Sequence, residues 1–101
     1  MRFLLKITPN VEVFNTYVKD GSAGQRMQSI INEAKPEAAY FAELNGYRTA
    51  MLIVNMDDVS QIPVLAEPWF LQFEAEVEFH PVIMVEDLAK ANLEHLGKKW
   101  R

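Results

Sequence analysis

The segment from Phe73 to Ile83 reads FEAEVEFHPVI, and its three glutamates and one histidine occupy alternate positions. On an extended strand, side chains two residues apart point to the same face and lie about 7 Å apart. An imidazole titrates near neutrality, and a neighbouring carboxylate favours its charged form. Glu78 and His80 are therefore the candidate pair for general acid–base catalysis. The alternative is that these side chains keep an open face of a strand soluble, or form ion pairs with groups such as Lys6.

Four further residues are candidates for binding a small molecule: Lys6, Tyr40, Met51 and Trp69. Lys6 could bind an anionic group, and the phenol of Tyr40 could hydrogen-bond to a ligand or fill a protein interface. Trp69 could cover a pocket between a helix and the sheet, or belong to the ordinary core. Met51 is expected on the same face as Tyr40.

Metal and cofactor chemistry has little support in the sequence. The chain has no cysteine, and His80 and His95 are its only histidines. A metal at Glu78 and His80 would need ligands from another strand or another chain, because alternate residues on one strand are too far apart to share an ion easily. We expect neither a metal nor a cofactor.

Length and charge restrict the class of protein further. With 101 residues the chain is expected to form a single domain over residues 1–101, and its formal net charge is −4. That charge argues against nucleic-acid binding, and the basic segment 98–101 is interpreted as a solvated tail. The apolar start MRFLLKI is interrupted by Lys6, so neither a signal peptide nor a membrane span is expected. We expect a cytoplasmic protein of bacterial type.

The first third of the chain alternates between strand and helix signals. Residues 2–8 alternate with a period of two, which predicts a strand. Asn10 is placed to cap a helix from Val11 to about Lys19. Ser22 and Gln25 then have the spacing of a capping box at the start of a second helix, which Pro36 ends.

The remaining elements follow a strong turn signal. Asn45-Gly46 predicts a tight hairpin between strands 38–44 and 47–56, with Glu43 opposite and paired with Arg48. A helix is expected near residues 59–71, with a kink or break at Pro68. A strand over residues 73–83 and one last helix, from about Glu86 until Gly97, complete the prediction.

This order predicts an α+β domain with a ferredoxin-like βαββαβ antiparallel sheet, helices on one face, and an extra C-terminal helix. Phe41, on the strand before the turn, is expected to lie under the helices. The opposite face, which carries Tyr40, Met51 and Glu78, has no element of the chain left to cover it. Exposed apolar faces mark partner surfaces, and a second copy related by a two-fold axis is the simplest partner.

The element order resembles the dimeric α+β barrel superfamily, in which two ferredoxin-like sheets pack face to face. Within it, the segments LAEPWF, FEAEVEFHPVIM and EDLAKA resemble a small bacterial family of unknown function. The resemblance implies a homodimer with a pocket between sheet and helices, but no particular reaction, because one fold supports many functions.

The main hypothesis from the sequence is therefore a homodimer with a small, mainly apolar ligand pocket. One alternative is a cofactor-independent monooxygenase or isomerase that acts on a small hydrophobic or aromatic molecule, with His80 as acid–base and Glu78 or Tyr40 assisting. Another is a non-catalytic binding or regulatory protein.

Overall fold

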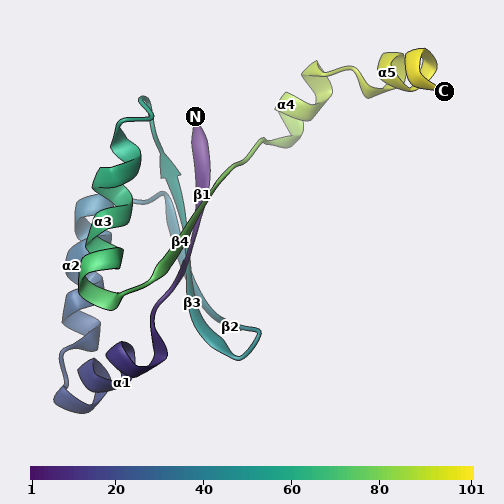
Figure 1. Cartoon of the computed structure of the whole chain (residues 1–101). Coiled ribbons are helices and arrows are strands. Elements are labelled where there is room, and N and C mark those ends of the chain that lie inside the picture. The colour runs from purple at the N-terminus through teal and green to yellow at the C-terminus, as the bar shows by residue number, and fades with distance from the viewer.

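The chain, described from Met1 to Arg101 in a computed structural model, forms four strands and five helices (Figure 1). The strands are β1 (Arg2–Thr8), β2 (Ala38–Leu44), β3 (Tyr47–Asn55) and β4 (Glu76–Pro81). The helices are α1 (Val11–Asp20), α2 (Ala23–Ala34), α3 (Gln61–Phe73), α4 (Val85–Lys90) and α5 (Leu93–Trp100).

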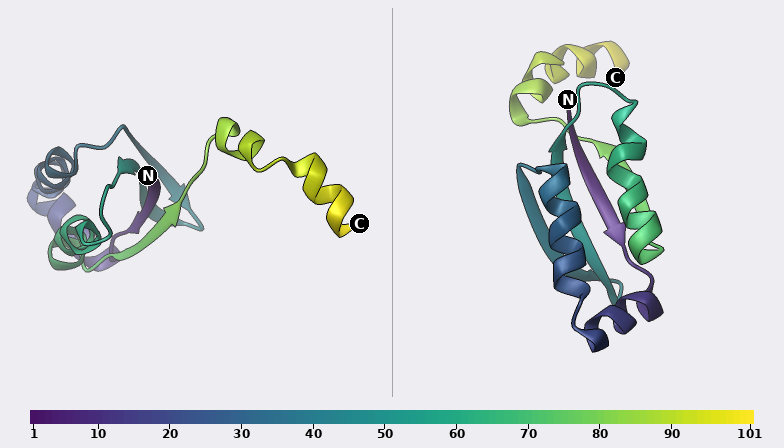
Figure 2. Two further views of the ribbon diagram at one scale, coloured as in Figure 1. Left: turned by 90° about the horizontal axis from the view of Figure 1, so that it is seen from above. Right: turned by 90° about the vertical axis from the view of Figure 1, so that its left-hand side faces the viewer.

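All strand pairs are antiparallel, and the sheet order is β2-β3-β1-β4. Helices α1, α2 and α3 lie on one face of this sheet, as the views from two directions show (Figures 1 and 2). The predicted α+β class with an antiparallel sheet is confirmed, and the arrangement is compatible with a ferredoxin-like fold. The face opposite these helices carries no helix; below it is called the open face.

The hairpin between β2 and β3 forms where the sequence predicts it. Asn45 and Gly46 both have positive φ angles, of 54° and 80°. This is the backbone conformation of a two-residue turn whose twist matches that of paired strands. The predicted register is confirmed, because Glu43 lies opposite Arg48 and Tyr40 opposite Met51.

The junction between α1 and α2 is held by side-chain hydrogen bonds. Asn10 caps α1 by accepting a hydrogen bond from the backbone N–H of Val13, as predicted, and Gly21 ends it at a φ of 82°. The predicted capping box at Ser22 is wrong. The Ser22 hydroxyl donates to Asp20 instead and accepts a hydrogen bond from Arg26. The competing carboxylate two residues earlier explains the difference.

Of the kink or break predicted at Pro68, the break is wrong, because helix α3 continues through this residue. Ala66 and Trp69 lie on either side of the proline and are both buried on the sheet. Burial of both turns of this helix offsets the lost backbone hydrogen bond that a proline in a helix interior causes.

The last third of the chain differs most from the prediction. Residues 73–75 do not belong to the strand, because Phe73 ends α3 and Glu74 adopts a left-handed conformation there. The single last helix is divided into α4 and α5 by Asn92, which has a φ of 53°, and Gly97 lies inside α5 instead of ending it. Every helix of the chain falls short of the length and hydropathy that a bilayer-spanning segment needs.

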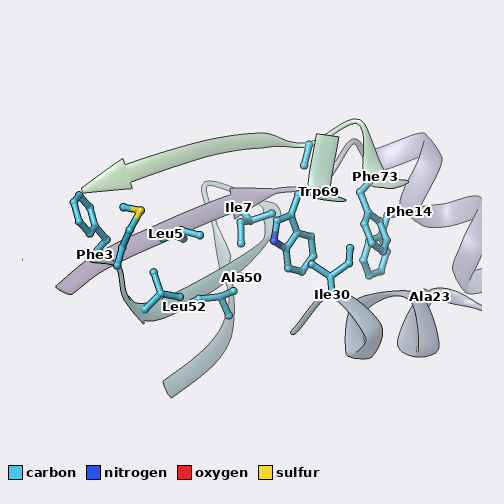
Figure 3. Packing of buried hydrophobic residues seen from close by; sticks show 13 residues of the cluster. Phe3, Leu5, Ile7, Phe14, Ala23, Ile30, Ala50, Leu52, Trp69 and Phe73 are labelled. Carbon is cyan, nitrogen blue, oxygen red and sulfur yellow. The ribbon is translucent and has the colours of Figure 1, made fainter. Parts of the chain in front are cut away.

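The hydrophobic core lies between the sheet and α1–α3 (Figure 3). Leu5, Ile7 and Leu52 from the sheet and Trp69 and Phe73 from α3 are fully buried in it. Phe41 lies on the helix side of the sheet, as predicted, but the expectation that the helices cover it is wrong, because Phe41 is 59% exposed. Strand β2 is an edge strand with no buried residue, so the helix layer does not cover it.

Candidate functional site

A row of side chains crosses the open face of the sheet. The strand register places Glu78 opposite Lys6, Lys6 opposite Met51, and Met51 opposite Tyr40. His80 lies next to Glu78 on β4. Five of the six predicted site residues therefore lie together on this face, and the sixth, Trp69, lies in the core on the other side of the sheet.

Glu78 is the centre of the polar part of this row. One carboxylate oxygen is 3.0 Å from His80 Nε2, and the other is 3.6 Å from Lys6 Nζ. The hydrogen bond to His80, with a further contribution from the charge of Lys6, holds the pKa of Glu78 below its ordinary value. Glu78 therefore remains a carboxylate near neutral pH, which suits orienting an imidazole better than donating a proton.

The row has little shelter from solvent. The side chains of Glu78 and His80 are each 52% exposed. An exposed ion pair contributes little to stability, and water screens its effect on a reacting group. No group of three or more histidine and acidic side chains converges closely enough to hold a metal ion. The row can thus bind a partner surface or assist a proton transfer, but alone it encloses no substrate.

A second candidate site lies on the other side of the sheet, where the helix layer meets β2 and β3. A pocket of about 530 Å³ opens there. Most of its lining is apolar, and its polar residues are Glu43, Arg48 and Thr49. The lining residues are Pro9, Phe14, Met27, Phe41, Ala42, Glu43, Arg48, Thr49, Ala50 and Trp69. We call this space the helix-side pocket.

Arg48 is the only cationic residue that lines the helix-side pocket. The cross-strand ion pair predicted with Glu43 does not form, although the two residues are direct partners in the sheet. The guanidinium instead lies over the ring of Phe14, with its central carbon 4.5 Å from the ring centroid. This cation–π contact leaves the hydrogen-bond donors of Arg48 without a carboxylate partner.

Trp69 contributes to the wall of the same pocket. Its side chain is fully buried, and its indole nitrogen, which points toward Ile7 in Figure 3, has no hydrogen-bond partner. A buried donor without a partner costs free energy, and it is uncommon in folded proteins. The indole packs against Phe73, with ring centroids 5.8 Å apart, which holds the ring in place.

Trp69 is predicted as a site residue from the sequence, and Phe14 only as one apolar position of a helix stripe. Arg48 could bind an anionic substrate on the sequence alone, but the ion pair with Glu43 is the preferred explanation for it. The one available signal was that Arg48 lies on the same strand face as Ala50 and Leu52, which the helices cover. No protein-family model matches the chain, and a search of curated proteins finds no significant match to it.

Proposed function

We propose that this protein is a homodimer of ferredoxin-like domains that binds a small, mainly apolar molecule with one acidic group in the helix-side pocket. The observation that carries the proposal is the guanidinium of Arg48, which lines an apolar pocket without a carboxylate partner. The resemblance to the dimeric α+β barrel superfamily agrees with both parts of it.

The size and lining of the pocket support a small-molecule ligand. A space of about 530 Å³ falls in the range typical of ligand sites, which are mostly apolar with a few polar groups that fix orientation. The aromatic rings of Phe14 and Phe41 supply apolar contact area, and the buried ring of Trp69 lies in the wall of the pocket. An aromatic or branched aliphatic body would therefore be accommodated here.

Arg48 favours an acidic group on that body. A guanidinium presents a planar fork of donors that matches a carboxylate, and such charge-assisted bonds are stronger than neutral ones. Glu43 also lines the pocket and repels a second negative charge. The combination favours a monoacid over a diacid.

The open face supports the dimer. Tyr40 is 61% exposed on it, and Met51 and Ile53 are only half-buried. A two-fold axis would bring the open faces of both copies to one interface. The polar end of each row, at Glu78 and Lys6, and its apolar end, at Met51 and Tyr40, would each contact the row of the other copy. Burial of this face would remove apolar surface from water, which is the main driving force for association.

The ligand can be tested with the intrinsic fluorescence of Trp69. The chain has two tryptophans, so the Trp100→Phe variant leaves Trp69 as the only indole. Titration of this variant with 1-naphthoate should change the Trp69 emission in a saturable way. The neutral analogue 1-naphthylmethanol should bind more weakly, because it lacks the charge that Arg48 recognises.

Two alanines give a matched pair of controls. Ala50→Val adds two methyl groups inside the pocket, whereas Ala39→Val makes the same change outside it on the neighbouring strand. Naphthoate binding should weaken only in Ala50→Val, with thermal unfolding used to show that both variants are folded. Equal naphthoate binding by the parent, Ala50→Val and Ala39→Val proteins would refute the pocket as the binding site. Equal binding of the acid and the alcohol would refute the role of the Arg48 charge.

The dimer is tested separately by sedimentation equilibrium at micromolar concentration. Met51→Glu should weaken it by placing a charge in the centre of the open face, whereas Val64→Glu on the exposed side of α3 should not. A wild-type protein that sediments as a monomer throughout the micromolar range would end this part of the proposal.

The acid–base hypothesis is retained as the second candidate because Glu78 holds His80 by a 3.0 Å hydrogen bond. In that case the partner copy would have to supply the shelter that the exposed row lacks. The cofactor-independent monooxygenase or isomerase predicted from the sequence would lose its turnover on replacement of His80 by Ala. A regulatory binding protein would instead show unchanged ligand binding and no turnover.

A further inference from the structure

The C-terminal segment, residues 82–101, contributes nothing to the core of its own chain. Every residue from Ile83 to Arg101 is exposed. The segment, which we call the arm, leaves the end of β4 and extends past the sheet on the side away from α1–α3 (Figures 1 and 2). Its hydrogen bonds with the body of the chain are confined to its base, where the Val82 N–H donates to the Arg2 carbonyl and the Arg2 guanidinium donates to the Met84 sulfur.

The arm makes the molecule far more elongated than its length requires. The radius of gyration is 17.1 Å and the longest dimension is 59 Å. A compact domain of about 100 residues has a radius of gyration near 13 Å. The difference reflects α4 and α5, which lie apart from the sheet and from the other helices (Figure 2).

The arm nevertheless has the pattern of a packed segment. Seven large apolar side chains are exposed along it: Ile83, Met84, Val85, Leu88, Leu93, Leu96 and Trp100. In α5, Leu93, Leu96 and Trp100 recur at the spacing of one helix face, while Lys98 and Lys99 lie between them. A stripe of this kind is normally buried, because a soluble chain rarely leaves a continuous apolar surface in water.

Strand β2 is the complementary feature on the body. It forms the sheet edge opposite the strand from which the arm departs. Its two aromatic residues are exposed on both faces of the sheet, Tyr40 by 61% on the open face and Phe41 by 59% on the helix side. An exposed apolar edge strand is prone to unwanted pairing, and proteins usually cover it.

The charges of the two parts are also complementary. Residues 1–81 contain six basic residues (Lys and Arg) but eleven acidic ones (Asp and Glu). The arm contains four basic and three acidic residues. The positive charges of the arm gather at its end, at Lys98, Lys99 and Arg101. On β2, Glu43 has no ion-pair partner within the chain.

We propose that the arm of each copy packs across β2 of a second copy, so that the two copies exchange their arms symmetrically. The apolar stripe of α4 and α5 covers Tyr40 and Phe41 of the other copy, and the basic end of the arm lies near its Glu43. The inference rests on the homodimer proposed above and adds the element that closes the β2 edge. The occupant is a second copy because the arm points away from its own β2 and carries the charge that this surface lacks.

Cross-linking tests the exchange directly, since the chain has no cysteine of its own. Single-cysteine variants are made at Tyr40 or Phe41 on β2 and at Leu93, Leu96 or Trp100 on the arm. When a β2 variant and an arm variant are mixed and oxidised, a disulfide-linked pair of chains should form. The matched mixture replaces the β2 variant with Leu71→Cys, an even more exposed position on α3, and should give no such pair.

A chain that carries both cysteines distinguishes exchange from folding back. Exchange predicts that the doubly substituted chain, diluted with an excess of wild type, forms no disulfide within itself. An internal disulfide under these conditions would overturn the proposal, because the arm would then cover the β2 strand of its own chain. Absence of cross-links in all the mixtures would also overturn it.

Sedimentation then separates this inference from the dimer on which it depends. The variant Leu96→Glu/Trp100→Glu should raise the dimer dissociation constant about tenfold or more, as expected when buried anchor residues are lost. Leu71→Glu should leave it unchanged. A wild-type dimer that is unaffected by the arm variant would refute arm exchange alone, whereas a wild-type monomer would refute the dimer itself.

Discussion

The guanidinium of Arg48 lies 4.5 Å from the centroid of the Phe14 ring, although Glu43 is its direct partner on the adjacent strand. The arginine is thereby held on the helix side of the sheet at an apolar pocket. The strand register thus places Glu43 opposite Arg48 as predicted, but their side chains form no ion pair. Arg48 instead lines the candidate binding site.

Substitution of Arg48 should therefore affect acidic ligands selectively. Arg48→Ala should weaken 1-naphthoate binding about tenfold or more, because a charge-assisted hydrogen bond contributes on the order of 1.5–3 kcal/mol. Arg48→Lys should retain part of the affinity, since an ammonium keeps the charge but not the planar fork. Fluorescence titration of Trp69 measures both effects.

Glu43→Gln is the reciprocal variant of this prediction. Removal of its negative charge should strengthen naphthoate binding and leave binding of the neutral naphthylmethanol unchanged. A gain for both probes would instead indicate that Glu43 acts by its shape or by the stability of the hairpin.

The buried indole of Trp69 leads to a second prediction, on stability. Trp69→Ala should lower the free energy of unfolding by about 3–5 kcal/mol, because it leaves a large cavity in the core. Trp69→Phe should cost no more than about 1 kcal/mol, since it also removes an unpaired buried N–H whose burial costs about 1–3 kcal/mol. Urea denaturation measures both values, and Leu71→Ala, at a solvent-exposed position on α3, is the control with little expected change.

The contact between His80 and Glu78 leads to a third prediction, on pH dependence. His80→Ala should raise the pKa of Glu78 toward its ordinary value of 4.5, because the hydrogen bond from His80 is the largest cause of its depression. Lys6→Ala should raise it less. Carbon-13 NMR titration of the Glu78 carboxyl measures these shifts, and a larger effect of Lys6→Ala would contradict the assignment.

The contact between His80 and Glu78 also determines how the contribution of Glu78 to stability changes with pH. Because the pKa of Glu78 is lower in the folded state than in the unfolded chain, its contribution to stability is present above pH 4.5 and is lost as the pH falls through the folded-state pKa. The His80→Ala variant should therefore show a smaller loss of stability than the wild type over this acidic range, at constant ionic strength.

Helix α3 provides the fourth prediction. Pro68 lies in the interior of the helix and leaves the carbonyl of Val64 without its usual donor. Pro68→Ala should therefore raise the free energy of unfolding, by about 1–3 kcal/mol. Pro63→Ala is the matched control, because Pro63 lies in the first turn, where backbone N–H groups have no helical partner. Equal effects of the two substitutions would show that Pro68 causes no particular strain.

Features that depend on a few neighbouring residues could be predicted from the sequence. Asn10 caps α1 and Asn45-Gly46 forms the hairpin turn, because each is determined by local backbone and side-chain geometry. The alternation of β3 identifies its buried face for a similar reason. Pro68 and Asn92 are two positions where the sequence-based prediction fails. Packing of α3 on the sheet keeps the helix continuous through Pro68, and Asn92 divides a helix by adopting a left-handed conformation.

The candidate sites depend on geometry that periodicity does not contain. Alternation places Glu78 and His80 on one face, and the register brings Lys6 to them. The helix-side pocket depends on how far the helix layer reaches over β2, which no local pattern of residues specifies. The choice of Arg48 between Glu43 and Phe14 depends in turn on where α1 lies above the sheet.

The order in which the chain is synthesised gives the exposed arm a further meaning. All the buried residues of this protein lie between Phe3 and Ala75. The ribosome therefore completes the whole interior before it translates α4 and α5, and a nascent chain has nothing inside itself for these helices to join. Under the arm exchange proposed above, maturation would take place in two stages, with rapid folding of the body followed by a slower association step whose rate depends on the concentration of released chains.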